Sequence, residues 1–264
     1  MRRWDIHTHA FHPKIAHKAV AHLNSAYDLA CEGDGTVAHL LEQEDAAGID
    51  RMALLCAATT PSQVIPANNY ALELQRIHPE RVLAFGTVHP GFARWGEELD
   101  RLERNGIRGI KLHPDFQGFR LDDPALTPIF DACQGRFVLL MHVGSLLPLP
   151  QCPSTPYMVA RLAAAFPRLT LVAAHFGGYR MWEHTLKGLP PSENLWCDTS
   201  STSPYASPEL LRALIAHFPP DRLLFGTDWP LYSPEGELRR FQEKSGLTDS
   251  HMEALMGNAR QLFA

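Results

Sequence analysis

The chain has 264 residues, of which 45% are hydrophobic and 20% are charged, and its formal net charge is −5. A chain of this size can bury one large core, and it lacks the clustered lysines and arginines that a nucleic acid or an anionic membrane selects. It contains no apolar run long enough to predict a membrane span, no apolar stretch of a secretory signal behind MRRWDIHTHAF, and five scattered cysteines, so we expect a cytoplasmic protein with reduced thiols.

Short apolar, β-branched runs recur along the chain and predict strands. They lie at residues 3–7, 51–56, 82–88, 109–112, 137–142, 169–175, 195–198 and 223–226. Because these runs are apolar without strict alternation, they are typical of parallel strands that are covered on both faces.

Stretches with apolar residues at helical spacing separate the predicted strands. They lie at residues 36–47, 62–78, 93–104, 124–133, 156–166 and 207–218. Thr36 suits the N-cap of the first helix, and Gly48 suits the position just after its end. This alternation predicts a single α/β domain over residues 1–264, a (β/α)8 TIM barrel, with an open doubly wound sheet as the alternative. Neither GxGxxG after the first strand nor GxxxxGK[ST] occurs, so nothing favours a nucleotide-binding sheet.

Three irregular segments follow predicted strands, at residues 10–35, 144–156 and 199–208. The first contains several histidines and has room for a short helix. Long loops after the strands of a barrel lie on its catalytic face, so we expect these segments to form a lid or a wall for the substrate.

Five polar residues fall at the C-terminal ends of predicted strands. His7 and His9 form HTH after the first strand, where a period of two places both side chains on one face. His142 ends FVLLMHVG, His175 ends LTLVAAHFGG, and Asp228 follows the last strand in LLFGTDWP. Since the C-terminal strand ends of a barrel converge, these side chains predict a site for a divalent metal.

These motifs resemble the amidohydrolase superfamily, in particular its amidohydrolase-related (amidohydrolase 2) branch. The resemblance extends over nearly the whole chain and is carried by DIHTHAF, GIKLHP, MHVG, AHFGG, FGTDWP and GNARQLF. It implies that His7, His9, His142 and Asp228 bind the metal and that Asp228 also accepts a proton. His175 would polarise the substrate or help to bind a second metal.

Lys111 lies in GIKLHP and shares a strand face with Gly109 and His113, so we expect it to point into the barrel. Binuclear members of the superfamily use a fourth-strand lysine, carbamylated by CO2, to bridge two ions. Because the branch that the chain resembles points to one metal, we favour an unmodified Lys111 paired with Asp228 or with a substrate carboxylate. A second metal held by Lys111 and His175 is the alternative.

Four further roles are predicted for the substrate pocket. His113 and Lys111 would line it, Arg180 would receive a carboxylate, and Trp229 would form a wall. Each residue also has an ordinary structural interpretation, such as a backbone-bonded histidine, a surface salt bridge or a packed indole.

The expected function is metal-dependent hydrolysis of an amide, lactone or ester in a small molecule. One divalent ion, zinc before manganese or iron, would activate water, with Asp228 taking its proton and His175 binding the oxyanion. The alternative is non-oxidative decarboxylation of an aromatic or unsaturated acid, in which Asp228 protonates carbon. A third interpretation is a barrel without catalytic activity that only binds a metal or a small molecule. The expected partner is a small-molecule substrate, with a homodimer possible.

Overall fold

The computed structural model describes residues 2–263. Eight parallel strands pair in the order of the sequence. They are β1 (Trp4–Thr8), β2 (Arg51–Leu54), β3 (Val82–Thr87), β4 (Gly109–Leu112), β5 (Val138–Met141), β6 (Thr170–Ala173), β7 (Leu195–Asp198) and β8 (Leu223–Leu224). All eight predicted strands are therefore confirmed, with shorter limits for most of them.

The sheet closes on itself between the two ends of the chain. Ile6 N donates to Phe225 O at 2.9 Å, Asp228 N donates to His7 O at 2.8 Å, and Thr8 forms a parallel bridge with Trp229. These contacts join β1 to the segment that follows β8. The prediction of a single (β/α)8 barrel is confirmed, and the open sheet is excluded.

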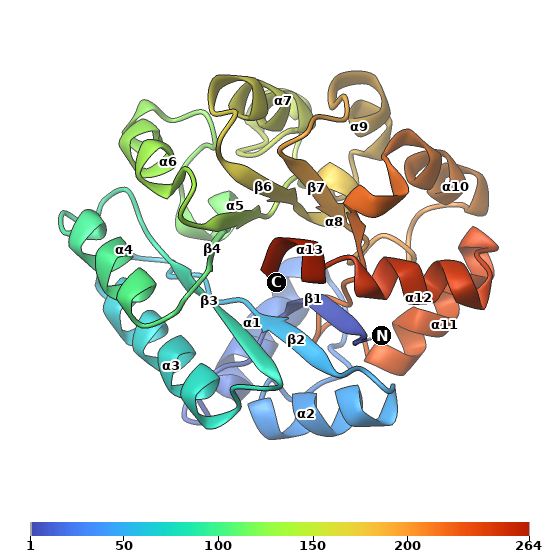
Figure 1. Ribbon diagram of the computed structural model, residues 1–264, viewed down its shortest axis with the longest axis horizontal. Helices are drawn as coiled ribbons and strands as arrows, with labels where there is room; N and C mark the ends of the chain where they lie inside the picture. The colour runs from blue at the N-terminus through green and yellow to red at the C-terminus, as the bar shows by residue number, and fades with distance from the viewer. Residues whose placement is uncertain (1, 264) are drawn as a thin grey trace.

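Helices form a ring around the barrel (Figure 1). The longer ones are α1 (Ala16–Tyr27), α2 (Val37–Ala46), α3 (Val64–Ile77), α4 (Trp95–Arg104), α6 (Thr127–Cys133), α7 (Pro156–Ala165), α9 (Trp182–Gly188), α10 (Pro208–His217), α11 (Pro234–Ser245) and α12 (Asp249–Gly257). Thr36 caps α2 by accepting from His39 N at 3.3 Å, and Gly48 has φ +67° just after it, as predicted. Within residues 2–263, none of the helices is long and apolar enough to cross a membrane.

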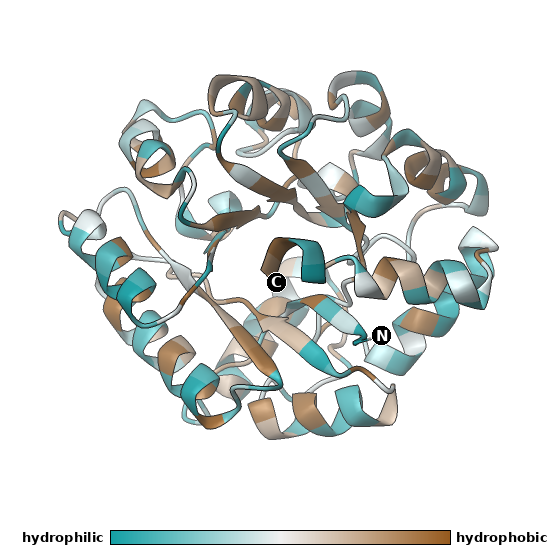
Figure 2. Ribbon diagram, in the orientation of Figure 1, coloured by the Kyte–Doolittle hydropathy of each residue, from teal (hydrophilic) through white to brown (hydrophobic). Residues whose placement is uncertain are grey.

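The core has two layers. Apolar side chains between strands and helices form the larger one. The outer helices α3 and α4 have one face in this layer and one in solvent, and hydrophobic and hydrophilic residues therefore alternate along them in Figure 2. The smaller layer fills the barrel interior and contains Trp4, Ile6 and Phe85. The C-terminal turn α13 (Arg260–Phe263) lies across this interior in Figure 1, and Phe263 packs against Trp4 with ring centroids 6.2 Å apart. One end of the barrel is thus closed, and the opposite end carries the polar site.

An irregularity in β1 lets this strand line both the core and the site. Asp5 pairs with Met52, but Thr8 pairs with Leu54, so β1 contains one residue more than β2 over this stretch. An extra residue shifts the alternation of side chains by one position. Trp4 and Ile6 therefore belong to the inner core, while His7 also faces the barrel interior.

Candidate metal centre

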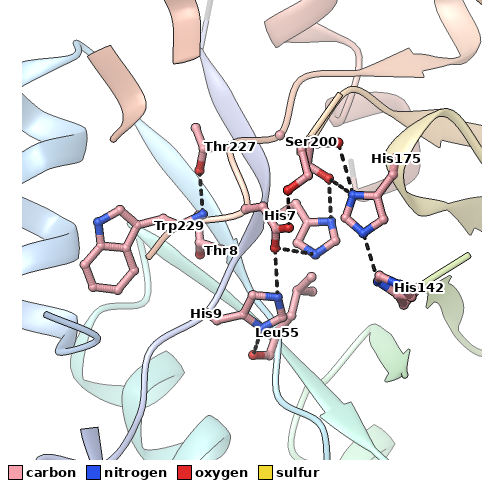
Figure 3. A network of polar contacts seen from close by, with 12 residues as sticks. His7, Thr8, His9, Leu55, His142, His175, Ser200, Thr227 and Trp229 are labelled. Carbon is pink, nitrogen blue, oxygen red and sulfur yellow. Dashed lines mark hydrogen bonds and ion pairs between the residues drawn. The ribbon is translucent and has the colours of Figure 1, made fainter. Parts of the chain in front are cut away.

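Three of the predicted ligands converge at the C-terminal end of the barrel. The Oδ1 atom of Asp228 lies 3.3 Å from His7 Nε2 and 3.4 Å from His9 Nε2 (Figure 3). His7 is in β1, His9 follows it directly, and Asp228 lies in the turn after β8. Asp228 has a left-handed φ of +65°, and the hydrogen bond from its backbone to His7 O holds that turn against β1. This backbone conformation is costly for a residue with a side chain, so it is a feature that the surrounding structure must impose.

The other ring nitrogen of each histidine is fixed by an acceptor. His7 Nδ1 lies 2.9 Å from Asp198 Oδ2, and His9 Nδ1 lies 3.1 Å from Leu55 O. Since a carboxylate and a carbonyl accept only, each Nδ1 carries the proton, and each Nε2 directs a lone pair toward Asp228. Metal-binding histidines are held by their second nitrogen in this manner. Two lone pairs and a carboxylate oxygen that face one another are suited to bind a cation, so these residues fit a metal site.

The protonation states also suit a metal. Burial lowers the pKa of His7 to about 4 and lowers that of His175. Burial by itself would raise the pKa of Asp228, but the facing imidazoles of His7, His9 and His175 lower it well below its usual value. At neutral pH His7 and His175 are therefore neutral and Asp228 is ionised, which are the forms that bind divalent ions.

His142 and His175 form a second group beside these three ligands. His175 Nε2 lies 2.9 Å from His142 Nδ1, and His142 Nε2 lies 3.1 Å from Gly144 O. His175 lies in the short turn α8 (Ala174–Gly177) with φ +61°, and its Nδ1 contacts Ser200 O at 3.0 Å. The carbonyl oxygens of Ser200 and Gly144 only accept, so the protons are on His175 Nδ1 and His142 Nε2. The unprotonated His175 Nε2 and His142 Nδ1 therefore face each other beside the cluster of His7, His9 and Asp228.

Lys111 points into the barrel, as predicted, but its contact is with a histidine. Its ammonium Nζ lies 3.1 Å from His7 Nε2, and the side chain is fully buried. Burial lowers the pKa of Lys111 to about 8. While it is protonated, the ammonium donates to the His7 Nε2 lone pair that a cation at this site would need.

Two residues that the sequence analysis did not single out form hydrogen bonds with the candidate ligands. One ends strand β7, and the other lies in the irregular segment that follows it. Asp198 ends β7 and accepts hydrogen bonds from His7 Nδ1 and, at 3.0 Å, from His175 N. Ser201 Oγ donates to Asp228 Oδ2 at 2.5 Å. Asp198 carries the same signal as the predicted ligands, a polar residue at a strand end. Residues 199–203 are buried, and none of residues 199–208 lines the cavity. The expectation that this segment forms a wall for the substrate is therefore corrected.

A cavity of about 670 Å³ opens over the cluster. It runs from His7, His9, His142 and Asp228 toward α1 and the start of α3. Its further lining comes from Phe11, His12, Lys14, Ile15, Lys18, Ala19, His22, Leu23, Tyr27, Leu55, Cys56, Thr59, Gln63, Pro66, Ala67, Tyr70, His113, Phe116 and Leu231, with the alanines at 10 and 57. Residues 10–35 thus form a wall and contain a helix, as expected. Residues 144–156 contribute none of the lining.

Of the predicted pocket residues, His113 lines the cavity and three do not. Lys111 is buried below it. The Trp229 indole is fully buried, points away from His7 in Figure 3, and donates to Gln43 Oε1 at 2.8 Å. The left-handed turn at Asp228 sends the next side chain outward, so the prediction of Trp229 as a pocket wall is corrected. Arg180 is exposed and stacks over the Tyr205 ring at 4.3 Å, so it too lies apart from the cavity.

Comparisons with solved structures show the same fold in enzymes of two kinds. A 2,6-dihydroxybenzoate decarboxylase from Rhizobium is 22% identical, with 100% of this chain and 99% of that chain covered and a TM-score of 0.72. A 5-carboxyvanillate decarboxylase from Novosphingobium aromaticivorans, solved with bound manganese, is 16% identical, with coverage of 99% and 97% and a TM-score of 0.72. A probable 2-pyrone-4,6-dicarboxylic acid hydrolase from Acinetobacter baumannii is 19% identical, with coverage of 100% and 99% and a TM-score of 0.69.

A search of curated proteins gave no match. The family model described as amidohydrolase, the amidohydrolase 2 family, matches residues 4–264. That match spans the barrel, the histidine pair of β1 and the Asp228 turn. The chain therefore belongs to the amidohydrolase 2 family of enzymes.

Proposed function

We propose that the protein is a metal-dependent, non-oxidative decarboxylase of an aromatic or unsaturated carboxylic acid. The observation that carries the proposal is the distribution of groups in the cavity. Phe11, Leu23, Tyr70 and Phe116 wall it with apolar and aromatic surface, while the ionised group Asp228 lies at the histidine end. A pocket of this kind takes a largely apolar ring and orients it by a few polar contacts at one end. The decarboxylases of benzoate derivatives with the same fold support this choice of reaction.

His7, His9 and Asp228 would hold the metal, with His142 beside them. Nitrogen and oxygen donors suit zinc, manganese and iron, and the manganese in one structural neighbour makes that ion a strong candidate. When bound, the ion supplies positive charge that fixes the oxygens of the substrate.

The reaction breaks the bond between the ring carbon and the carboxylate carbon, releases CO2 and places a proton on the ring carbon. Asp228 is the one carboxylate among the described residues that line the cavity, so we assign the delivery of that proton to it. The ionised Asp228 takes this proton from solvent and passes it to the ring carbon as CO2 leaves, and because its pKa is held low, it returns to its ionised form. General acid catalysis of this type requires the donor to lie beside the reacting carbon.

Hydrolysis is the second candidate, and the pyrone hydrolase of the same fold favours it. The hydrolytic mechanism expected from the sequence uses His175 to bind the oxyanion. However, His175 donates its one ring proton from Nδ1 to Ser200 O, which leaves Nε2 without a proton for an oxyanion, and His175 is absent from the cavity lining. The proposed decarboxylation does not need this donor, so it suits the arrangement better.

The test is a product assay on protein reconstituted with manganese or zinc. Hydroxybenzoates, other aromatic acids and unsaturated acids are incubated in D2O beside a panel of lactones, esters and amides. We expect CO2 release from an acid, with deuterium at the carbon that carried the carboxylate. Ring opening of a lactone with no CO2 from any acid would contradict the proposal and favour the hydrolase.

A further inference from the structure

Tyr27 is a cavity residue to which the reaction proposed above assigns no role. It is the last residue of α1 and lines the cavity together with His113 and Phe116. Its ring lies against Phe116 and Tyr179, with centroids 5.9 Å and 5.8 Å apart. Its hydroxyl oxygen lies 3.3 Å from His113 Nε2. The long segment after β1 therefore brings a phenol to the same end of the cavity as His142.

The orientation of His113 is fixed from three sides. Its ring stacks between Phe116, at 4.1 Å and 14°, and His142, at 4.0 Å and 11°. Its Nδ1 atom accepts a hydrogen bond from Phe116 N at 3.4 Å, as the cap of the short helix α5 (Pro114–Gln117). A nitrogen that accepts from an N–H carries no proton, so the ring proton must be on Nε2. His113 is therefore the donor to Tyr27, and the tyrosine oxygen accepts.

This assignment leaves the hydroxyl hydrogen of Tyr27 free. Among residues 2–263, His113 is the one hydrogen-bond partner of this hydroxyl. Tyr70, the other tyrosine in the lining, differs, because its hydroxyl donates to Phe11 O at 3.2 Å. Burial raises the pKa of Tyr27 well above its usual value, so the group remains a phenol. The cavity thus contains one tyrosine whose proton is used by the protein and one whose proton is available to a ligand.

We infer that Tyr27 is a substrate-binding residue that donates its hydroxyl proton to an oxygen of the bound acid. His113 is its positioning residue, since the bond from Nε2 directs the phenol oxygen and turns its hydrogen away from the imidazole. A donor at this end complements Asp228, so the ring of the acid is oriented from two directions. The inference deepens the proposed decarboxylation and rests on it for the nature of the ligand.

Tyr27→Phe tests the inference, with Tyr157→Phe as the matched control. The hydroxyl of Tyr157 also lies beside a histidine, 3.1 Å from His184 Nδ1, but Tyr157 is absent from the cavity lining. Both changes remove one hydroxyl and keep the ring, so packing is retained. We expect Tyr27→Phe to lower kcat/KM by about 10- to 100-fold, the loss that follows removal of a hydrogen bond to a charged oxygen. Tyr157→Phe should stay within about threefold of the wild type, because its hydroxyl lies outside the cavity. Equal kcat/KM values for wild type and Tyr27→Phe would overturn the inference and leave the proposed function standing.

The positioning role of His113 has its own readout. His113→Gln retains an N–H donor at the distance of Nε2, whereas His113→Leu removes it. With metal content shown to be equal, we expect His113→Gln to restore a larger part of kcat/KM than His113→Leu. Equal losses in the two variants would overturn the positioning role.

A binding assay separates failure of the inference from failure of the proposed function. If the wild type turns over no acid, benzoate binding to the metal-loaded protein is measured by calorimetry. Weaker binding to Tyr27→Phe than to Tyr157→Phe would support the inference although the decarboxylation fails. Equal binding to the two variants, or no binding to the wild type, would overturn it.

Discussion

Asp198 and His7 are joined by a buried hydrogen bond at the C-terminal end of the barrel, with Oδ2 2.9 Å from Nδ1, although their residue numbers differ by 191. Both side chains are almost completely buried. The bond fixes which nitrogen of His7 carries the proton, and so makes Nε2 available as a ligand. Burial by itself would raise the pKa of Asp198, but the interaction with His7 and neighbouring hydrogen bonds lower it, so the carboxylate stays ionised.

Asp198→Asn should therefore weaken metal binding without unfolding the barrel. The amide loses the charge that holds the His7 proton on Nδ1, and loss of such a partner typically costs about 10- to 100-fold in metal affinity. Competition with a fluorescent chelator measures the affinity. Asp221→Asn, at an exposed position, is the control and should bind as the wild type does. Unchanged affinity in Asp198→Asn would show that the bond does not orient the ligand.

Lys111→Met should tighten metal binding at pH 7. The ammonium lies 3.1 Å from His7 Nε2, and methionine removes its charge while it fills similar space. Since the pKa of Lys111 is lowered to about 8, the lysine is charged below that pH and repels the ion. The advantage of the variant should therefore shrink as the pH rises past about 8.

Metal affinity measured between pH 6 and pH 9 on both proteins checks this prediction. If Lys111→Met instead loses metal at every pH, the lysine contributes to binding, and a carbamylated bridge between two ions becomes the better account. The intact mass of the wild type in bicarbonate would then show the added CO2.

Asp228→Asn should remove turnover and spare the fold. An asparagine cannot deliver a proton, and loss of a general acid typically lowers the rate by about 100-fold or more. His7 and His9 remain, so we expect the variant to retain much of its metal. The readouts are kcat on the acid that the wild type decarboxylates, metal content and circular dichroism. Near-normal kcat in a metal-loaded variant would refute the role of Asp228.

Glu237 should make the stability of the protein depend on pH. It is buried in α11, accepts from Ser203 Oγ at 2.7 Å, and burial raises its pKa to about 8. A carboxyl whose pKa is higher in the folded state binds its proton more tightly there. Its contribution to stability is therefore complete below the unfolded pKa of about 4.5 and is lost as the pH rises through about 8.

Melting temperatures of wild type and Glu237→Gln between pH 5 and pH 9 test this sign. The variant has no proton to lose at this position. The difference in Tm, variant minus wild type, should therefore increase as the pH rises. Glu235→Gln, at an exposed position of the same helix, should follow the wild type at every pH. A constant difference between Glu237→Gln and wild type would contradict the prediction.

The strands and the convergence of three candidate ligands could be predicted from sequence because the relevant signals are local. Apolar runs mark the strands, and polar residues at their ends mark the site, as for His7, His9 and Asp228. Asp198 had the same signal. Its contact with His7 is visible only in three dimensions, where closure of the barrel brings β7 to within two strands of β1.

The remaining misses have backbone causes. The left-handed φ of +65° at Asp228 turns the Trp229 side chain toward the outer core. Residue preferences do not predict this conformation at a position other than glycine. The extra residue in β1 likewise places both Ile6 and His7 in the interior, against simple alternation. The wall of the cavity is formed by α1 and the start of α3, and residues 199–203 are buried and absent from its lining.

Metal content, measured by mass spectrometry on protein purified without chelator or a nickel column, tests the central claim most directly. The account predicts one divalent ion per chain in the wild type and in His22→Ala, a cavity residue outside the cluster. It predicts loss of that ion in the double variant His7→Ala/His9→Ala, which removes both lone pairs that face Asp228. Absence of metal from the wild type after reconstitution with zinc, manganese or iron, or full retention in the double variant, would contradict the account.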